Sequence, residues 1–131
     1  MAMSQWTHVC GCIRFDALRL PGMPFSRLEH IKALLGNSCS FDDPPEIWDQ
    51  CNVPLGSEGS IQFFYYENPH KPSAAAFAVG IIGDLRDFGS DQVPRITEWF
   101  ERIINTDNAM IRNAILRIDV EGEDAPIILQ R

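Results

Sequence analysis

The sequence predicts one α+β domain whose strands and helices follow each other in the order β-α-β-β-α-β. A nearly continuous apolar run, Ala74–Ile82, is short and ends in turn residues, as buried strands do. Two stretches, Phe25–Gly36 and Val93–Ile104, place their apolar residues at helical spacing. Two others, Trp6–Leu18 and Met110–Gly122, alternate apolar and polar residues like half-buried strands. This order predicts the ferredoxin-like arrangement, a four-stranded antiparallel sheet with both helices on one face.

The first half of the chain divides into a strand, a helix and a long irregular segment. In the strand, odd-numbered residues from Val9 to Phe15 are apolar or glycine, whereas the even-numbered ones from Cys10 to Asp16 carry thiols or charges. The helix begins near a proline and ends at Gly36. The segment Asn37–Gly59 is either a functional loop or an ordered surface loop that covers a sheet edge.

The second half begins with an aromatic strand, Ser60–Glu67, which carries large rings on both faces. The turn Asn68–Pro72 joins it to the apolar strand and makes a hairpin. Gly83–Gly89 reads as a turn that leads into the second helix. In the tail Glu123–Arg131, the residues Ile127–Leu129 form either a short edge strand or an arm that reaches a partner subunit.

The face of the sheet opposite the helices is also expected to be covered. Ala76, Ala78, Gly80 and Ile82 lie on that face of the apolar strand, where small apolar residues permit close packing of a partner. We therefore expect a homo-oligomer. The alternative is a monomer whose long loop folds across this face.

Composition and charge limit the function classes. The 131 residues fit a single domain, 1–131, with ordinary apolar (45%) and charged (22%) content. The net charge of −7 argues against binding a DNA or RNA polymer, which needs a basic surface. No apolar run approaches the roughly 20 residues of a membrane span, and the first residues lack the features of a signal peptide. These observations predict a cytoplasmic protein.

The cysteines do not match a metal site. Cys10 and Cys12 are separated by one residue in a strand pattern, and Cys39 and Cys51 follow far downstream. Zinc ligands are usually two to four residues apart on a turn. We expect four buried structural thiols in a reducing compartment, with no metal and no cofactor.

The turn after the apolar strand is the first candidate binding site. It carries Arg86 and Phe88 just before the free N–H groups of a helix. A guanidinium, an aromatic face and a helix N-terminus suit a small anionic ligand that contains a ring. The alternative is a plain turn, with Phe88 in the core and Arg86 paired to Asp84 or Asp87.

Two further features favour close contact with a phosphate-bearing ligand. The loop Gly56-Ser57-Glu58-Gly59 lets the backbone approach a ligand, and the alternative is a tight turn that enters the strand. The other feature is a set of arginines near the first and last strands, namely Arg14, Arg19, Arg112 and Arg117. Such a cluster binds phosphates selectively, but ordinary ion pairing with nearby carboxylates is the alternative.

Catalytic residues are hard to assemble from spacing. The three histidines are scattered, and no Ser-His-Asp or Cys-His arrangement is evident. A small nucleotide- or phosphoester-processing enzyme would have to use Cys10, His8 or Glu58.

Several stretches together resemble a known family. They are Trp6-Thr-His-Val9, Ile13–Ala17, Gly56–Ser60, Glu67–Pro69, Gly83–Phe88, Trp99-Phe100, Ile111–Ile115 and Asp119–Glu121. This set resembles the phage anti-Thoeris sponge proteins, which counter a bacterial defence system. The resemblance covers about residues 6–122 and is least specific over Asn37–Asn52.

The resemblance implies a function. Members of that family bind cyclic ADP-ribose isomers and sequester these signals without destroying them, and some also hold cyclic oligonucleotides at separate sites. They form dimers that assemble to hexamers, with pockets near subunit interfaces. By similarity, Phe88 stacks on adenine and Arg112 contacts phosphate, with Arg19 and Arg86 as further phosphate contacts, and Gly56–Gly59 lines a second pocket.

Three functions therefore stand as expectations. The first is a non-catalytic, homo-oligomeric sponge for cyclic nucleotide signals in the host cytoplasm. The second is the small enzyme described above. The third is a structural interaction domain that uses its apolar sheet face.

Overall fold

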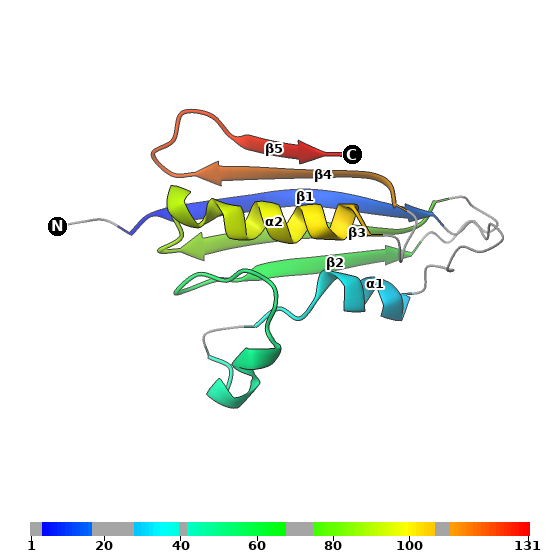
Figure 1. The fold of residues 1–131 in the computed structure, drawn as a ribbon, viewed down its shortest axis with the longest axis horizontal. Coiled ribbons are helices and arrows are strands. Elements are labelled where there is room, and N and C mark those ends of the chain that lie inside the picture. Colours follow the sequence, from blue (N-terminus) through cyan, green and yellow to red (C-terminus); the bar gives the residue numbers. More distant parts are fainter. Residues whose placement is uncertain (1–3, 17–27, 40–41, 68–74, 107–110) are drawn as a thin grey trace.

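The computed structural model describes residues 4–16, 28–39, 42–67, 75–106 and 111–131. In chain order the elements are β1 (Trp6–Asp16), α1 (Leu28–Leu35), the 3-10 helix η1 (Pro45–Gln50), β2 (Ile61–Glu67), β3 (Ala75–Arg86), the 3-10 helix η2 (Ser90–Gln92), α2 (Val93–Ile104), β4 (Ile111–Val120) and β5 (Ile127–Gln130). Figure 1 shows the strands side by side with α2 lying along them. No helix among the described residues is long and apolar enough to cross a membrane.

The strands form one antiparallel sheet of five strands in the order β2-β3-β1-β4-β5. The predicted four-stranded ferredoxin-like fold is therefore wrong, because β5 extends the sheet beyond β4. After β4 the chain reverses at Gly122, whose φ of 91° suits a tight turn, and Ile127 then pairs with Ile118. Of the two alternatives for the tail, the structure shows the edge strand.

A second correction concerns the exit of β3. The residues Gly83–Arg86 were predicted to form part of a turn, but they continue the strand. They do so because β1 is long enough to pair with them, for example Trp6 with Arg86 and Val9 with Gly83. The alternation of buried residues also continues through this stretch to Leu85.

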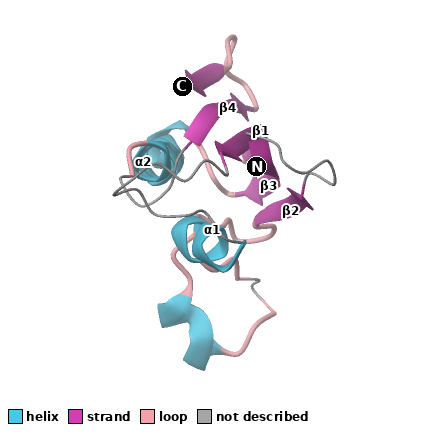
Figure 2. Ribbon diagram, turned by 90° about the vertical axis from the view of Figure 1, so that its right-hand side faces the viewer, coloured by secondary structure: helices cyan, strands magenta, loops and turns pink. Residues whose placement is uncertain are grey.

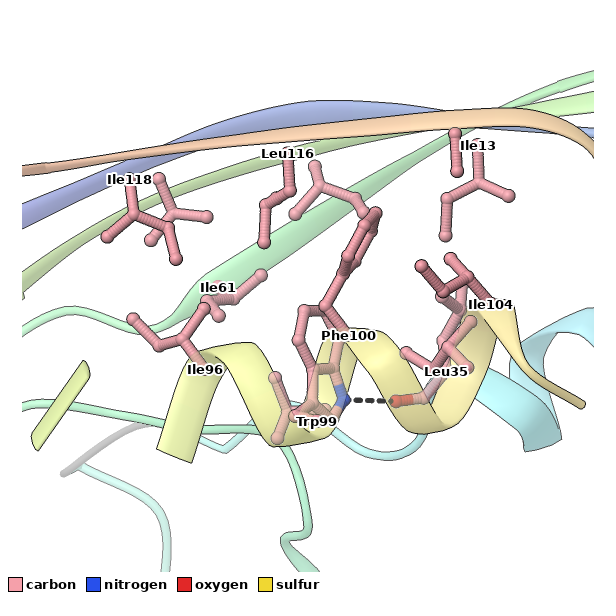
Figure 3. Close-up of a cluster of buried hydrophobic side chains, with 14 of the residues drawn as sticks. Ile13, Leu35, Ile61, Ile96, Trp99, Phe100, Ile104, Leu116 and Ile118 are labelled. Carbon is pink, nitrogen blue, oxygen red and sulfur yellow. Dashed lines mark hydrogen bonds between the residues drawn. The ribbon is translucent and has the colours of Figure 1, made fainter. Parts of the chain in front are cut away.

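Both helices pack on the same face of the sheet, as Figure 2 shows. The helix α2 buries Ile96, Phe100 and Ile104 against strand residues such as Leu116 (Figure 3). Trp99 connects the two helices, because its Nε1–H donates a hydrogen bond of 3.1 Å to the carbonyl oxygen of Leu35 at the end of α1. The core thus lies between the helices and one face of the sheet, and none of the described helices lies on the other face.

The segment between α1 and β2 is an ordered surface loop held by a disulfide. Cys39 and Cys51 form this bond with their Cα atoms 5.6 Å apart, a separation typical of disulfides. The prediction of four buried thiols is wrong for these two residues, because the loop folds back on itself and brings them together, and it is wrong about burial for Cys10, which is exposed, and Cys12, which is half-buried. Asn52 reinforces the loop by accepting a 2.7 Å hydrogen bond from the backbone N–H of Asn37.

Candidate functional site

One loop is tied to the end of β3 and forms what we call the corner, Gly56–Gly59 together with Arg86 and Asp87. The backbone N–H of Ser57 donates to the carbonyl oxygen of Arg86 at 2.9 Å, and the N–H of Arg86 donates to the carbonyl oxygen of Glu58 at 3.0 Å. Gly59 has a φ of 77°, and a Cβ atom there would overlap the carbonyl oxygen of Asp84. Glycine is therefore required for the loop to lie this close to the strand.

Side chains reinforce the corner. The Arg86 Nη1 atom lies 2.7 Å from Glu58 Oε1, and its Nε–H donates to the Ser4 hydroxyl at 3.1 Å. Ser57 donates from its hydroxyl to Asp87 Oδ2 at 2.5 Å, and this bond is the main reason that the pKa of Asp87 is lowered. The guanidinium and the carboxylate of the Arg86–Glu58 pair are both partly exposed, so either can turn to a ligand.

A cleft of about 480 Å³ opens beside the corner, on the face of the sheet opposite α1 and α2. We call this face the open face. The lining residues come from the corner loop, β1, β2 and β3, namely Trp6, Glu58, Gly59, Ser60, Gln62, Phe64, Ile82, Gly83 and Asp84. The volume lies within the range of about 300–1,000 Å³ that small-molecule sites occupy.

The lining offers three kinds of contact. Phe64 is 59% exposed, so its ring is available for stacking on a flat ligand. Gln62 and Ser60 supply amide and hydroxyl groups, and at present the amide of Gln62 donates to the Ser60 hydroxyl at 2.7 Å. Glu58 and Asp84 add two carboxylates, which accept hydrogen bonds from ligand hydroxyls.

A histidine between carboxylates lies next to the cleft. The Nδ1 atom of His8 is 2.6 Å from Asp84 Oδ1, and its Nε2 atom is 3.6 Å from Glu121 Oε2. The hydrogen bond with Asp84 is the largest cause of a raised His8 pKa, with burial opposing it. Both ring nitrogens therefore face carboxylates rather than the Cys10 thiol that the enzyme alternative would pair with His8.

The remaining predicted residues lie elsewhere. The Phe88 side chain is fully buried, as the plain-turn alternative expected, and a buried ring offers no face to a ligand. The same alternative misjudged Arg86, whose partner is Glu58. Arg112 is at the far end of the sheet, with its Nη1 atom 3.2 Å from Asp16 Oδ1. Arg19 lies outside the described residues.

The predicted arginine cluster is largely paired in the structure. Arg117 holds Asp119 through two hydrogen bonds of 2.8 and 3.2 Å, and this contact lowers the pKa of Asp119. Arg112 pairs as described above, whereas Arg14 is exposed on the open face. Ordinary ion pairing, the alternative interpretation, therefore describes Arg112 and Arg117.

Sequence reasoning missed the aromatic side of the cleft. Trp6 and Phe64 are separated by most of β1 and the whole loop region in the sequence, yet they line one hollow. The available signal was the presence of rings on both faces of the aromatic strand. Among the described residues, no three His, Cys, Asp or Glu side chains are grouped so that they could hold a metal ion.

No family model, curated protein or solved structure matches this chain. The function has to be inferred from the site and from the resemblance described above.

Proposed function

We propose that this protein is a non-catalytic binding protein that sequesters cyclic ADP-ribose-type immune signals in the cleft beside the corner. The observation that carries the proposal is the corner itself. Arg86 and Gly56–Gly59 were selected from separate stretches of the sequence, and the fold joins them through backbone hydrogen bonds at the rim of a ligand-sized cleft.

The cleft has groups that match each part of such a ligand. An adenine ring stacks on Phe64, which replaces the buried Phe88 in this role. The diphosphate is bound by Arg86 after its guanidinium turns from Glu58. The ribose hydroxyls donate to the carboxylates of Glu58 and Asp84, a contact that proteins also use to hold nucleotide riboses.

The proposal assigns no residue to catalysis. A sponge needs slow release and complete recovery of the ligand, which stacking, a charged hydrogen bond and partial enclosure provide. Cyclic oligonucleotides share the ring, ribose and phosphate chemistry, so they belong to the same class of candidate ligand.

The setting of this function follows from the resemblance. It implies a phage protein that acts in the cytoplasm of the bacterial host, as a dimer that assembles to a hexamer. A disulfide is uncommon in that compartment. The corner and cleft lining contain neither Cys39 nor Cys51, so ligand binding is expected to persist after reduction.

A depletion-and-release assay tests the proposal. Purified protein is incubated with cyclic ADP-ribose isomers and cyclic di- and trinucleotides, removed by filtration, and then heat-denatured so that the released compound can be identified by mass spectrometry. Depletion followed by release of the intact ligand is the expected result. Release of a cleaved product would instead identify an enzyme, and no depletion by any of these ligands would refute the proposal.

Two pairs of variants locate the site. Phe64→Ala removes the stacking ring, and we expect affinity to fall about 5- to 150-fold, the effect of losing roughly 1–3 kcal/mol of stacking. Ile47→Ala is its control, since Ile47 is an exposed apolar side chain on η1 that belongs neither to the cleft nor to the open face. Arg86→Ala is compared with Arg112→Ala in the same way, because both arginines are half-exposed and ion-paired. Equal losses within either pair would place the site elsewhere.

A further inference from the structure

The open face exposes a group of large apolar side chains. They are Phe64, Tyr66, Ile82, Ile115 and Ile128, which are between 45% and 59% exposed and come from β2, β3, β4 and β5. They form two groups, one of Phe64, Tyr66 and Ile82 and one of Ile115 and Ile128, and the small residues Gly80 and Cys12 lie in register between them. An apolar group of this kind on one face is typical of a surface that contacts another protein.

The centre of this face is a pair of thiols. The strand β1 is the third of five in the sheet, and Gly11 is the middle residue of β1. Cys10 and Cys12 flank Gly11, point to the open face and form no disulfide. Small side chains at the centre let a second surface approach closely.

The two ends of the open face differ in charge. At the end where β1 begins, His8 is paired in register with Asp84 on β3 and Asp119 on β4, and Glu121 lies beside them. We call this the acidic end. At the other end, Arg14 pairs in register with Ala78 and Asn113 and is exposed, while Arg112 and Asp16 pair with each other, so an excess of positive charge remains and we call this the basic end.

The area of the face is sufficient for a stable pair. Five strands spaced about 4.8 Å apart and a central strand of 11 residues at about 3.3 Å each give roughly 600 Å². Two such faces bury about 1,200 Å² in total, which is the lower limit of the usual range for specific interfaces.

We infer that the open face binds the open face of a second copy of this chain, with the acidic end of each copy over the basic end of the other. A two-fold axis that lies between the sheets and crosses the strands at Gly11 produces this arrangement. It places His8 over Arg14 of the second copy and Cys10 over Cys12 of the second copy. An axis along the strands would instead place the two acidic ends together, which like charges oppose.

This arrangement also completes the cleft, a step that rests on the proposed function. The cleft opens at the acidic end of β2 and β3. The two-fold axis crosses β2 at Phe63, which lies in register with Ile81 and Gly11. Ser60 and Tyr66 are each three residues from Phe63 on opposite sides, so Ser60 lies under Tyr66 of the second copy. Arg14 of the second copy lies near Asp84. The second copy thus contributes a ring and a guanidinium, both of which suit an aromatic, phosphate-bearing ligand.

Cross-linking tests the arrangement in a background that carries Cys10→Ser and Cys12→Ser and keeps the disulfide. His8→Cys and Arg14→Cys are introduced separately, and each protein is treated with a short bis-maleimide alone and after mixing. In the proposed dimer, residue 8 of one copy and residue 8 of the other are six residues apart along the strands, about 20 Å, and the same holds for residue 14. Residue 8 of one copy instead faces residue 14 of the other. We expect cross-linked pairs only in the mixture. Efficient cross-linking of either variant alone would overturn the end-over-end arrangement.

Molar mass in solution tests the interface without any ligand. The wild-type protein is expected to be at least dimeric by light scattering, and Ile82→Lys to be monomeric with an unchanged circular dichroism spectrum. Ile47→Lys is the matched control, because Ile47 is an exposed isoleucine on η1, away from the open face, and this variant should keep the wild-type mass. A monomeric wild-type protein, or an Ile82→Lys variant that keeps the wild-type mass, would refute the inference. A dimer that binds none of the nucleotides would refute the proposed function alone.

Discussion

Replacing Gly59 by alanine should break the corner, and Gly122 provides the comparison that isolates the cause. Both glycines have a positive φ, so alanine at either costs about 1 kcal/mol in backbone strain. At Gly122 nothing lies within 4 Å of the added Cβ atom, whereas at Gly59 it overlaps the Asp84 carbonyl oxygen. The loop must then withdraw and lose its two backbone hydrogen bonds with Arg86, worth about 1 kcal/mol each.

The expected destabilisation is therefore about 3 kcal/mol for Gly59→Ala and about 1 kcal/mol for Gly122→Ala. Urea unfolding followed by circular dichroism measures both values. Hydrogen exchange adds a local readout, since the amide of Arg86 should lose protection only in Gly59→Ala. If the two variants were destabilised equally, within about 0.5 kcal/mol, the close approach of loop and strand would contribute nothing and the reasoning would be refuted.

Three further predictions concern other parts of the fold. Trp99→Phe removes the hydrogen bond to the buried carbonyl group at the end of α1 and should lower the free energy of unfolding by about 1–3 kcal/mol; a loss below about 0.5 kcal/mol would contradict a structural role for this bond. The Cys39–Cys51 bond implies two titratable thiols per denatured chain before reduction and four after it, and four thiols before reduction would exclude the bond. Reduction should also lower the free energy of unfolding by about 3 kcal/mol. The raised pKa of His8 implies that its imidazole titrates above pH 6.5 by NMR and that Asp84→Asn lowers this pKa; an unshifted titration would contradict the contact. The contribution of His8 to stability is complete below about pH 6.5 and is lost as pH rises through the raised pKa.

Local patterns in the sequence predicted the helices and most strands. The helix Val93–Ile104 has the bounds that its apolar spacing indicated, because one strongly amphipathic stripe faces the sheet. The exit of β3 was mispredicted since Gly83 and Asp84 are residues that favour turns. Pairing with the start of β1 outweighs that preference, and such pairing is not visible in a local window.

The candidate site shows the same division. The loop Gly56–Gly59 and Arg86 are candidates by residue type, because glycines let a backbone approach a ligand and a guanidinium binds phosphates. Burial could not be predicted in this way, and Phe88 lies in the core although its neighbours in the chain are polar or glycine. The aromatic wall of the cleft depends on the distance between Phe64 and Trp6, which only the assembled sheet determines.

The position of β1 has a consequence for how the chain reaches its fold during synthesis. This strand leaves the ribosome before the other strands of the sheet, yet its side-chain partners lie far along the chain, such as Asp84 for His8, 76 residues later, and Arg112 for Asp16, 96 residues later. The central strand therefore finds its first partner, β3, only after about 60 further residues have been translated, and its second partner, β4, later still; such non-local pairing slows folding. A nascent chain that stalls before β4 would leave one edge of β1 unpaired, and chaperone demand should remain high until β4 covers that edge.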